Sequence, residues 1–145
     1  MENTIDPAML PIITQRMHRN SFANYVGIRI TACRQGYAVG EVDLRQEILN
    51  PLGIVHGGCL YTLADTTAGM AAATYGYACL TLSSDFHFLS PGSQTAKVIA
   101  EATLVHRGKT VLVFSVKITS DGGRELAAGT FSFFNTGKPP ACTAG

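Results

Sequence analysis

Alternating hydrophobic and polar positions predict that much of this chain forms β-strands. The clearest case is the segment 109–120, in which every second residue from 112 to 118 is large and apolar (Leu112, Phe114, Val116 and Ile118). Because successive side chains of a strand point to opposite faces, this pattern indicates a sheet with one buried face. Strands are expected at 26–32, 37–46, 79–89, 96–106, 109–120 and 124–135, and a loop at 50–53.

The segment 57–75 has the different pattern of a helix that is buried on nearly all sides. Apolar and small residues cover almost its whole circumference, and only Gly69 weakens the helical periodicity. A shorter helix is expected at 6–19, with Asp6 as its cap and Pro7 at the first helical position. One long apolar helix followed by an antiparallel meander is an α+β pattern, in which the sheet curls around the helix. We expect one domain over residues 1–136 and a loose tail over 137–145.

Composition and charge exclude several classes of protein. Charged residues make up 14% of the chain, hydrophobic residues 46%, and the formal net charge is +1. These values exclude an acidic disordered chain and a basic nucleic-acid-binding protein. The most apolar stretch, 54–82, is interrupted by polar residues, and the first twenty residues lack the apolar core of a signal peptide, so neither a membrane span nor secretion is expected. Low charge combined with high apolar content predicts that another subunit covers part of the surface.

The four cysteines predict neither a disulfide framework nor a metal site. Cys33, Cys59, Cys79 and Cys142 are widely spaced and form no Cys-x-x-Cys pair or zinc-binding pattern with histidine. We interpret them as reduced thiols in a cytoplasmic protein, and we expect no metal and no other cofactor.

A single carboxylate stands in the apolar helix. Between Glu47 and Asp85 the only charged residue is Asp65. A carboxylate that loses water has to be paired, hydrogen-bonded or protonated, because burying it alone costs more than a domain can supply. Asp65 is therefore a candidate nucleophile or general base, and an exposed or capped aspartate is the structural alternative.

The beginning of the same helix offers a second chemical group. Backbone N–H groups in the first turn lack intrahelical partners and carry the positive end of the helix dipole, so they polarise a carbonyl oxygen placed there. We predict that the Gly57 N–H is the main donor and that Gly58 marks the tight entry into the helix; a plain glycine turn is the alternative. Asp65 lies nine residues after His56, about 13 Å along the axis and on the opposite side. If both serve one reaction, Asp65 must meet the Gly57 end of a second subunit's helix.

Two neighbouring polar residues have roles that the sequence leaves open. Asn50 offers a donor and an acceptor that suit the positioning of a water or a carbonyl, and it equally suits a turn before Pro51. His56 suits orientation of the loop or a hydrogen bond near the carbonyl, and equally a purely structural role.

These motifs together resemble a known family. In chain order they are Asn50, His56-Gly57-Gly58, Leu63-Ala64-Asp65, Ser83-Ser84-Asp85-Phe86 to Pro91-Gly92, and His106-Arg107-Gly108-Lys109. With the closing strand they cover residues 20–135 and resemble the hotdog-fold acyl-CoA thioesterases of the phenylacetate-degradation type, a group that includes mammalian thioesterase superfamily member 2. One departure is Ser90, where many relatives have arginine before the proline.

The resemblance implies a hotdog fold, thioester hydrolysis and a dimer with composite sites, built further into a tetramer. It also implies that Ser83 helps near the attacking water, although on the residues alone Ser83 is an ordinary strand serine. Arg107 and Lys109, on either side of Gly108 in a turn, are candidates for the CoA phosphates, with simple solvation as the alternative. An exposed β-edge would suit the amide-rich pantetheine arm.

We therefore predict a cytoplasmic, homo-oligomeric acyl-CoA thioesterase that acts on an aromatic or medium-chain acyl group. Two alternatives remain on the same fold. One is a non-catalytic acyl-CoA-binding or acyl-carrier-binding protein, against which the placement of Asp65 argues. The other is a hotdog dehydratase, which would need a catalytic histidine paired with an acid.

Overall fold

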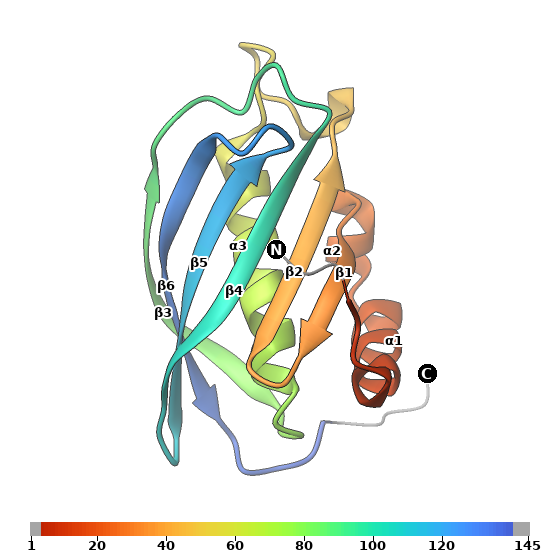
Figure 1. Cartoon of the computed structure of the whole chain (residues 1–145), viewed down its shortest axis with the longest axis vertical. Coiled ribbons are helices and arrows are strands. Elements are labelled where there is room, and N and C mark those ends of the chain that lie inside the picture. Colours follow the sequence, from red (N-terminus) through yellow and green to blue (C-terminus); the bar gives the residue numbers. More distant parts are fainter. Residues whose placement is uncertain (1–3, 141–145) are drawn as a thin grey trace.

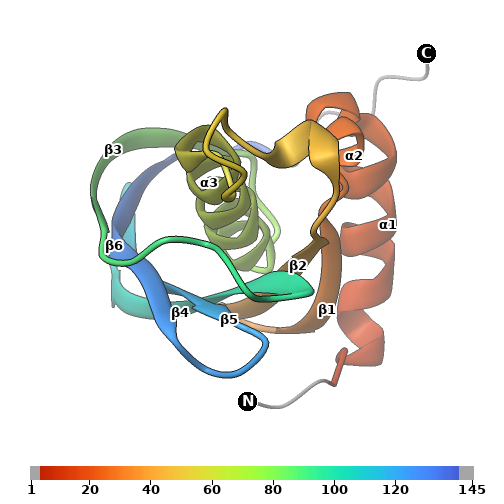
Figure 2. The same cartoon turned by 90° about the horizontal axis from the view of Figure 1, so that it is seen from above.

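A curved antiparallel sheet wraps around one long helix (Figures 1 and 2). The computed structural model describes residues 4–140. Its strands are β1 (Arg29–Arg34), β2 (Tyr37–Asp43), β3 (Cys79–Phe88), β4 (Lys97–Arg107), β5 (Val111–Ser120) and β6 (Glu125–Asn135). They form one sheet in the order β1-β2-β4-β5-β6-β3, and every neighbouring pair is antiparallel. This confirms the predicted α+β hotdog architecture.

The central helix α3 (Gly57–Ala73) packs against the concave face of the sheet, as the apolar pattern predicts. Its Leu63 and Met70 belong to one buried cluster with Phe114 of β5 and Phe131 of β6. At Gly40 of β2 a Cβ atom would lie 2.4 Å from the Thr67 hydroxyl oxygen and 3.3 Å from Cδ1 of Leu63. Glycine fits there because a side chain would force Thr67 of the helix to move.

The N-terminal region contains one helix more than the sequence indicates. The side chain of Asp6 caps η1 (Pro7–Met9), which continues into α1 (Leu10–Arg19), so the helix predicted at 6–19 is confirmed. The strand predicted at 26–32 is wrong in its first residues, because they end a second short helix, α2 (Ser21–Val26). Asn20 caps this helix and Gly27, at φ 95°, ends it. The strand itself starts only at Arg29.

The order of the strands also differs from a simple meander. Strands β4, β5 and β6 follow one another in the sheet, but β3 pairs with β6 at the opposite edge from β1. The connection from β3 to β4, residues 89–96, therefore crosses one end of the molecule (Figures 1 and 2). There the carbonyl of Gly92 accepts a hydrogen bond from the Val55 N–H. That bond holds the crossing loop beside the beginning of α3.

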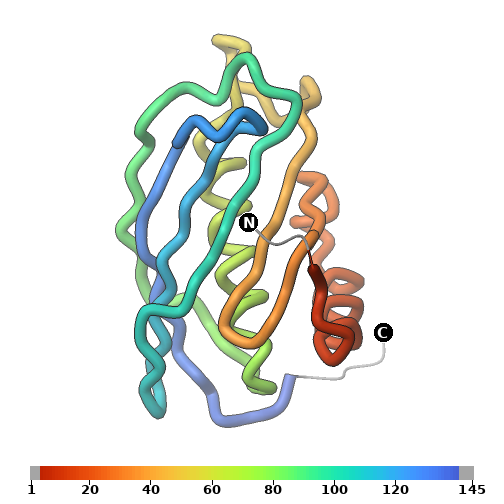
Figure 3. Tube along the Cα trace, in the orientation of Figure 1, coloured from red at the N-terminus to blue at the C-terminus, as the bar shows by residue number. Residues whose placement is uncertain are grey.

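The two edges of the sheet differ in whether another segment of the chain pairs with them. Along β1, the chain start pairs with Cys33, whose N–H donates to Thr4 and whose carbonyl accepts from the Asp6 N–H (Figure 3). Beyond β3 there is no further strand in residues 4–140, and Leu80 and Leu82 of this strand are 63% and 55% exposed. An open, apolar edge strand is a site for pairing with another chain.

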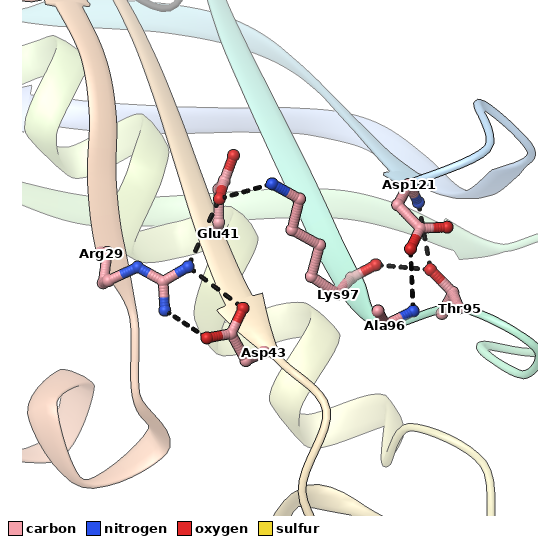
Figure 4. A network of polar contacts seen from close by, with 7 residues as sticks. All are labelled: Arg29, Glu41, Asp43, Thr95, Ala96, Lys97 and Asp121. Carbon is pink, nitrogen blue, oxygen red and sulfur yellow. Dashed lines mark hydrogen bonds and ion pairs between the residues drawn. The ribbon is translucent and has the colours of Figure 1, made fainter.

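On the outer face of the sheet, ion pairs connect β1, β2 and β4 (Figure 4). Glu41 is only 6% exposed and receives both Lys97, at 3.1 Å, and Arg29, at 3.4 Å. Arg29 also pairs with Asp43 at 2.8 Å. A nearly buried carboxylate is thus matched by two cations, as burial of a charge requires.

The C-terminal part stays attached further along than expected. Ala78 accepts a hydrogen bond from the Thr136 N–H and donates one to the carbonyl of Lys138. The loose tail predicted from residue 137 therefore does not begin there. The remainder of that prediction, with Cys142, lies outside the described residues. No helix within residues 4–140 is long and apolar enough to cross a membrane.

Candidate active site

The first turn of α3 has one backbone donor that no hydrogen bond uses. His56 precedes the helix in an extended conformation, and its Nδ1 accepts a hydrogen bond of 2.8 Å from the Gly58 N–H. The N–H groups of Cys59 and Leu60 donate to the His56 carbonyl. Among the described residues, the Gly57 N–H has no partner. It points out of the positive end of the helix, as an oxyanion donor would.

A hollow of about 350 Å³ opens beside Gly57, between the helix start and the crossing loop. Asn50 lines it together with Phe88 and Pro91. The side-chain oxygen of Asn50 accepts from the N–H groups of Leu52 and Ile54, at 2.9 and 3.3 Å, so the turn role considered above is present. Its amide hydrogens remain as donors for a ligand.

Asp65 lies half-buried in the middle of α3, and a hydroxyl group holds its carboxylate. The Thr81 hydroxyl donates to Oδ1 of Asp65 at 2.7 Å. Thr81 was not predicted from the sequence. Of the residues that were, the structure brings none to this carboxylate.

The register of β3 explains why Thr81, and not Ser83, contacts Asp65. Thr81 pairs with Phe133, and Ser84 pairs with Phe131; both phenylalanines face the core. Ser83 pairs with Ser132 and is exposed, because the register shifts between Thr81 and Ser83. Strict alternation would give both residues the same face. The bulge at this point separates them.

A second contact joins the second turn of α3 to the middle of β3. The hydroxyl groups of Tyr61 and Ser84 are 2.7 Å apart, and the Tyr61 ring packs against Phe86 and Phe131, with centroid distances of 5.8 and 5.3 Å. The helix and the edge strand are thus fixed at the same level.

Within one chain the predicted site residues form three separate groups. Asn50, His56, Gly57 and Gly58 lie at the beginning of α3, and Asp65 lies eight residues further, about 12 Å along the axis. The turn between β4 and β5, with Arg107, Gly108 and Lys109, is at the other end of the molecule (Figure 1). There the Arg107 guanidinium stacks over the Tyr75 ring at 4.1 Å. One chain alone does not assemble these groups.

Within residues 4–140, neither the Cys59 thiol nor a cluster of metal-binding side chains provides an alternative catalytic group. Burial raises the pKa of Cys59, in the first turn of α3, to about 11. At neutral pH it is a thiol, which is a poor nucleophile. Residues 4–140 contain no group of three or more His, Cys, Asp or Glu side chains that could hold a metal ion.

The chain is similar in sequence and in fold to known thioesterases. The chain is 30% identical over 105 residues to the acyl-coenzyme A thioesterase PaaI of Escherichia coli, which covers 72% of this chain and 75% of that protein. The structure of the E. coli PaaI protein superposes with a TM-score of 0.87 at 24% identity, covering 94% and 99% of the two chains.

A hypothetical thioesterase from Streptococcus pneumoniae, solved with coenzyme A, superposes with a TM-score of 0.80 at 29% identity and covers 88% and 99% of the chains. Two further structures of that protein carry alanine in place of an aspartate and of a threonine, which are 16 residues apart (68 − 52 in its numbering). Residues 52–127 of the present chain match the thioesterase superfamily model. This protein therefore belongs to the thioesterase superfamily.

Proposed function

We propose that this protein hydrolyses the thioester bond of an acyl-CoA, with an aromatic or medium-chain acyl group, at sites shared between two subunits. The relatives named as acyl-CoA thioesterases and the streptococcal structure with bound coenzyme A support this substrate class. In each site, the Gly57 N–H polarises the carbonyl, and Asp65 of a second subunit attacks it or activates a water.

One observation carries the proposal: a contact between α3 and the open edge strand β3 shows which residue of the helix lies beside the middle of that strand. Tyr61 contacts Ser84, at the middle of β3. A two-fold axis through the middle of β3 joins two open edges and sets the two α3 helices side by side and antiparallel. Gly57 and Asp65 are each four residues from Tyr61, on opposite sides of it. The operation therefore brings Gly57 of one helix level with Asp65 of the other.

The chemistry follows from these two groups. The carbonyl oxygen gains negative charge as the nucleophile adds, and the Gly57 N–H and the helix dipole stabilise that charge. As a base, Asp65 takes a proton from the attacking water; the C–S bond then breaks, and the CoA sulfur leaves with a proton. Direct attack by the carboxylate would expel the CoA sulfur, which leaves with a proton, and give a mixed anhydride on Asp65 that water hydrolyses to the same acid and the free carboxylate.

Thr81, Asn50 and His56 position the reacting groups. The Thr81 hydroxyl orients the Asp65 carboxylate from 16 residues along the chain. The aspartate and threonine replaced in the streptococcal protein have the same spacing. Because the Nδ1 of His56 accepts from Gly58, a neutral imidazole carries its proton on Nε2 and donates from there. The amide of Asn50 provides a further donor at the same hollow.

The same two-fold symmetry brings the candidate CoA-binding turn of one subunit toward the site of the other. Arg107 and Lys109 lie beyond the end of α3, far from Gly57 of their own chain. With Gly57 of one α3 level with Asp65 of the other, the end of each helix extends about 12 Å past the Gly57 of its partner. These cations then lie on the outer side of the second subunit's site, where CoA phosphates would need them. Exposed Leu80, Val105 and Phe134 on the outer face support a further association of dimers into a tetramer.

Thiol release from a panel of acyl-CoAs tests the proposal. Asp65→Asn should lower kcat by about a hundredfold or more. The matched control is Asp43→Asn, since Asp43 is an exposed carboxylate of β2, on the outer sheet face, that pairs with Arg29 at 2.8 Å, and it should leave kcat unchanged. Full activity of Asp65→Asn would exclude the catalytic role. Binding of acyl-CoA without any turnover by the wild type would instead favour the non-catalytic alternative.

A further inference from the structure

One half-buried cation takes no part in the chemistry described so far. Arg16 of α1 reaches over α3 at Gly69, where a Cβ atom would lie 3.4 Å from its Nη2 and 3.7 Å from the Phe133 ring. These are ordinary van der Waals distances, so the guanidinium packs directly over the Gly69 position. Burial lowers the pKa of Arg16, and electrostatic interactions with Cys79 and Asp65 act against that shift.

Arg16 has no anion of its own. Among the described residues, no carboxylate lies within ion-pair distance of its guanidinium and no hydrogen bond to it is formed. A guanidinium with five donors that is partly removed from water normally has an anionic partner, because it otherwise loses hydration without compensation. Within residues 4–140 the Arg16 guanidinium lacks such a partner, and a bound anionic ligand would supply one.

The surroundings of Arg16 are open to a ligand. It lines a pocket of about 300 Å³ between α1 and the beginning of β3, together with Arg19, Asn20 and Cys79. The lining contains two arginines and no carboxylate. The pocket is therefore suited to an anionic oxygen group.

Two separate relations place this pocket next to the catalytic carboxylate. Gly69 follows Asp65 by one helical turn, about 6 Å along the same face of α3. On the sheet, Phe133, which borders the guanidinium, is the cross-strand partner of Thr81, whose hydroxyl holds Asp65. An anion at Arg16 would thus lie about one helical turn from a carbonyl attacked by Asp65.

This spacing distinguishes between the two anionic parts of an acyl-CoA. An acyl chain of about five carbons spans roughly 6 Å by ordinary covalent geometry. The extended pantetheine arm is roughly 14 Å long, about the length of four backbone residues. It would place the CoA phosphates too far from the carbonyl to match the distance between Asp65 and Arg16. The distance favours an anion on the acyl group.

We propose that Arg16 binds a carboxylate at the far end of a short acyl group, so that the protein prefers thioesters of dicarboxylic acids. This inference rests on the proposed thioesterase function and narrows its substrate class. The acyl chain extends from the carbonyl at Asp65 along the face of α3 toward Gly69, and its carboxylate pairs with the fork of the Arg16 guanidinium.

Glutaryl-CoA and pentanoyl-CoA form the matched substrate pair, since both have five acyl carbons and only one has the terminal carboxylate. For the wild type, kcat/KM should be about tenfold or more higher for glutaryl-CoA, the value of one charge-assisted pair. Arg16→Met should remove this preference and retain pentanoyl-CoA hydrolysis. Lys117→Met, which deletes an exposed cation on the outer sheet face, is the control and should leave the ratio unchanged.

Three outcomes would overturn the inference, each in a distinguishable way. If the wild type hydrolyses pentanoyl-CoA through Asp65 but shows no preference for glutaryl-CoA, the inference fails and the proposed function stands. If neither thioester is hydrolysed, both fail. If Arg16→Met lowers kcat/KM for CoA thioesters but not for the same acyl groups on N-acetylcysteamine, Arg16 binds a CoA phosphate instead.

Arg16→Lys keeps the experiment decisive if the methionine variant does not fold. Lysine retains the charge but not the planar fork, so the preference for glutaryl-CoA should fall to an intermediate value. An unchanged preference in a folded Arg16→Lys protein, together with an unchanged preference in Arg16→Gln, would contradict the assignment.

Discussion

Mixing two inactive variants gives the sharpest test of sites shared between subunits. The first variant is Gly57→Pro, which deletes the single N–H proposed to stabilise the oxyanion. Gly57 is the first residue of α3, a position that proline tolerates well, and His56 before it has φ −60° and ψ 135°, the extended conformation that a residue before proline prefers. The helix should therefore form as before, with only the donor removed.

The expected loss can be worked out from this one hydrogen bond. Removing a single oxyanion-hole donor lowers kcat by about a hundredfold to a thousandfold. Any side chain at Gly57 also approaches the Phe88 ring, since a Cβ would lie 3.4 Å from its Cε1. Gly57→Ala has the same Cβ but keeps the N–H, so it is the matched control and should retain activity within a few fold.

The second variant is Asp65→Asn, and the informative sample contains both chains in equal amounts. Each site needs Gly57 from one chain and Asp65 from the other. It is intact when the chain that supplies Gly57 is the Asp65→Asn variant and the chain that supplies Asp65 is the Gly57→Pro variant. Random assembly produces this combination at about a quarter of all sites. Co-expression or joint refolding should therefore restore about a quarter of the wild-type rate of thiol release.

The reasoning is refuted if the mixed sample stays as inactive as its parents. Every chain in it lacks one of the two groups, so a site built within a single chain cannot recover. Native mass spectrometry on differently tagged chains should confirm that mixed dimers formed, because without exchange the assay would measure only the parents.

Three further predictions concern single residues. Thr81→Val removes the hydroxyl that holds Asp65 and should lower kcat about tenfold with an unchanged melting temperature, whereas Thr81→Ser should retain activity. Gly129→Ala places a Cβ 2.1 Å from a backbone carbonyl of β3 and should lower the free energy of unfolding by about 3 kcal/mol or more in chemical denaturation. A hydrogen bond from the Ala96 N–H holds the pKa of Asp121 below its usual value of 3.8 (Figure 4). This stabilises the fold above about pH 4 and is lost at lower pH, so the difference in melting temperature between wild type and Asp121→Asn should shrink on acidification.

Hydrophobic patterning predicts most of the fold because each of its signals is local. The apolar circumference of α3 and the alternation along β5 both arise from residues that are near one another in the chain. The position of β3 beside β6 depends on how a crossing loop packs over the start of α3, and no local pattern encodes that. The short helix α2 was missed because its signals, a cap at Asn20 and a left-handed Gly27, are single residues.

The candidate site divides in the same way. Gly57 and Asp65 could be identified from the sequence because a helix start and an isolated charge are visible in one dimension. The partner of Asp65 could not, since the choice between Thr81 and Ser83 depends on a bulge that shifts the register of β3. Arg16 was missed because its link to Gly69 joins segments that are far apart in sequence.

In the proposed dimer, the register of the paired β3 strands determines the geometry of the active site. Residues 4–6 pair with Cys33 at the β1 edge, whereas no further strand within residues 4–140 covers the β3 edge, which is open for association. A slip of two residues in the pairing of two β3 strands would shift one α3 along the other by about 7 Å. That is more than one helical turn of 5.4 Å and would carry Asp65 past the Gly57 N–H. Substitutions at the edge that alter the pairing should therefore abolish catalysis even where both subunits stay folded and associated.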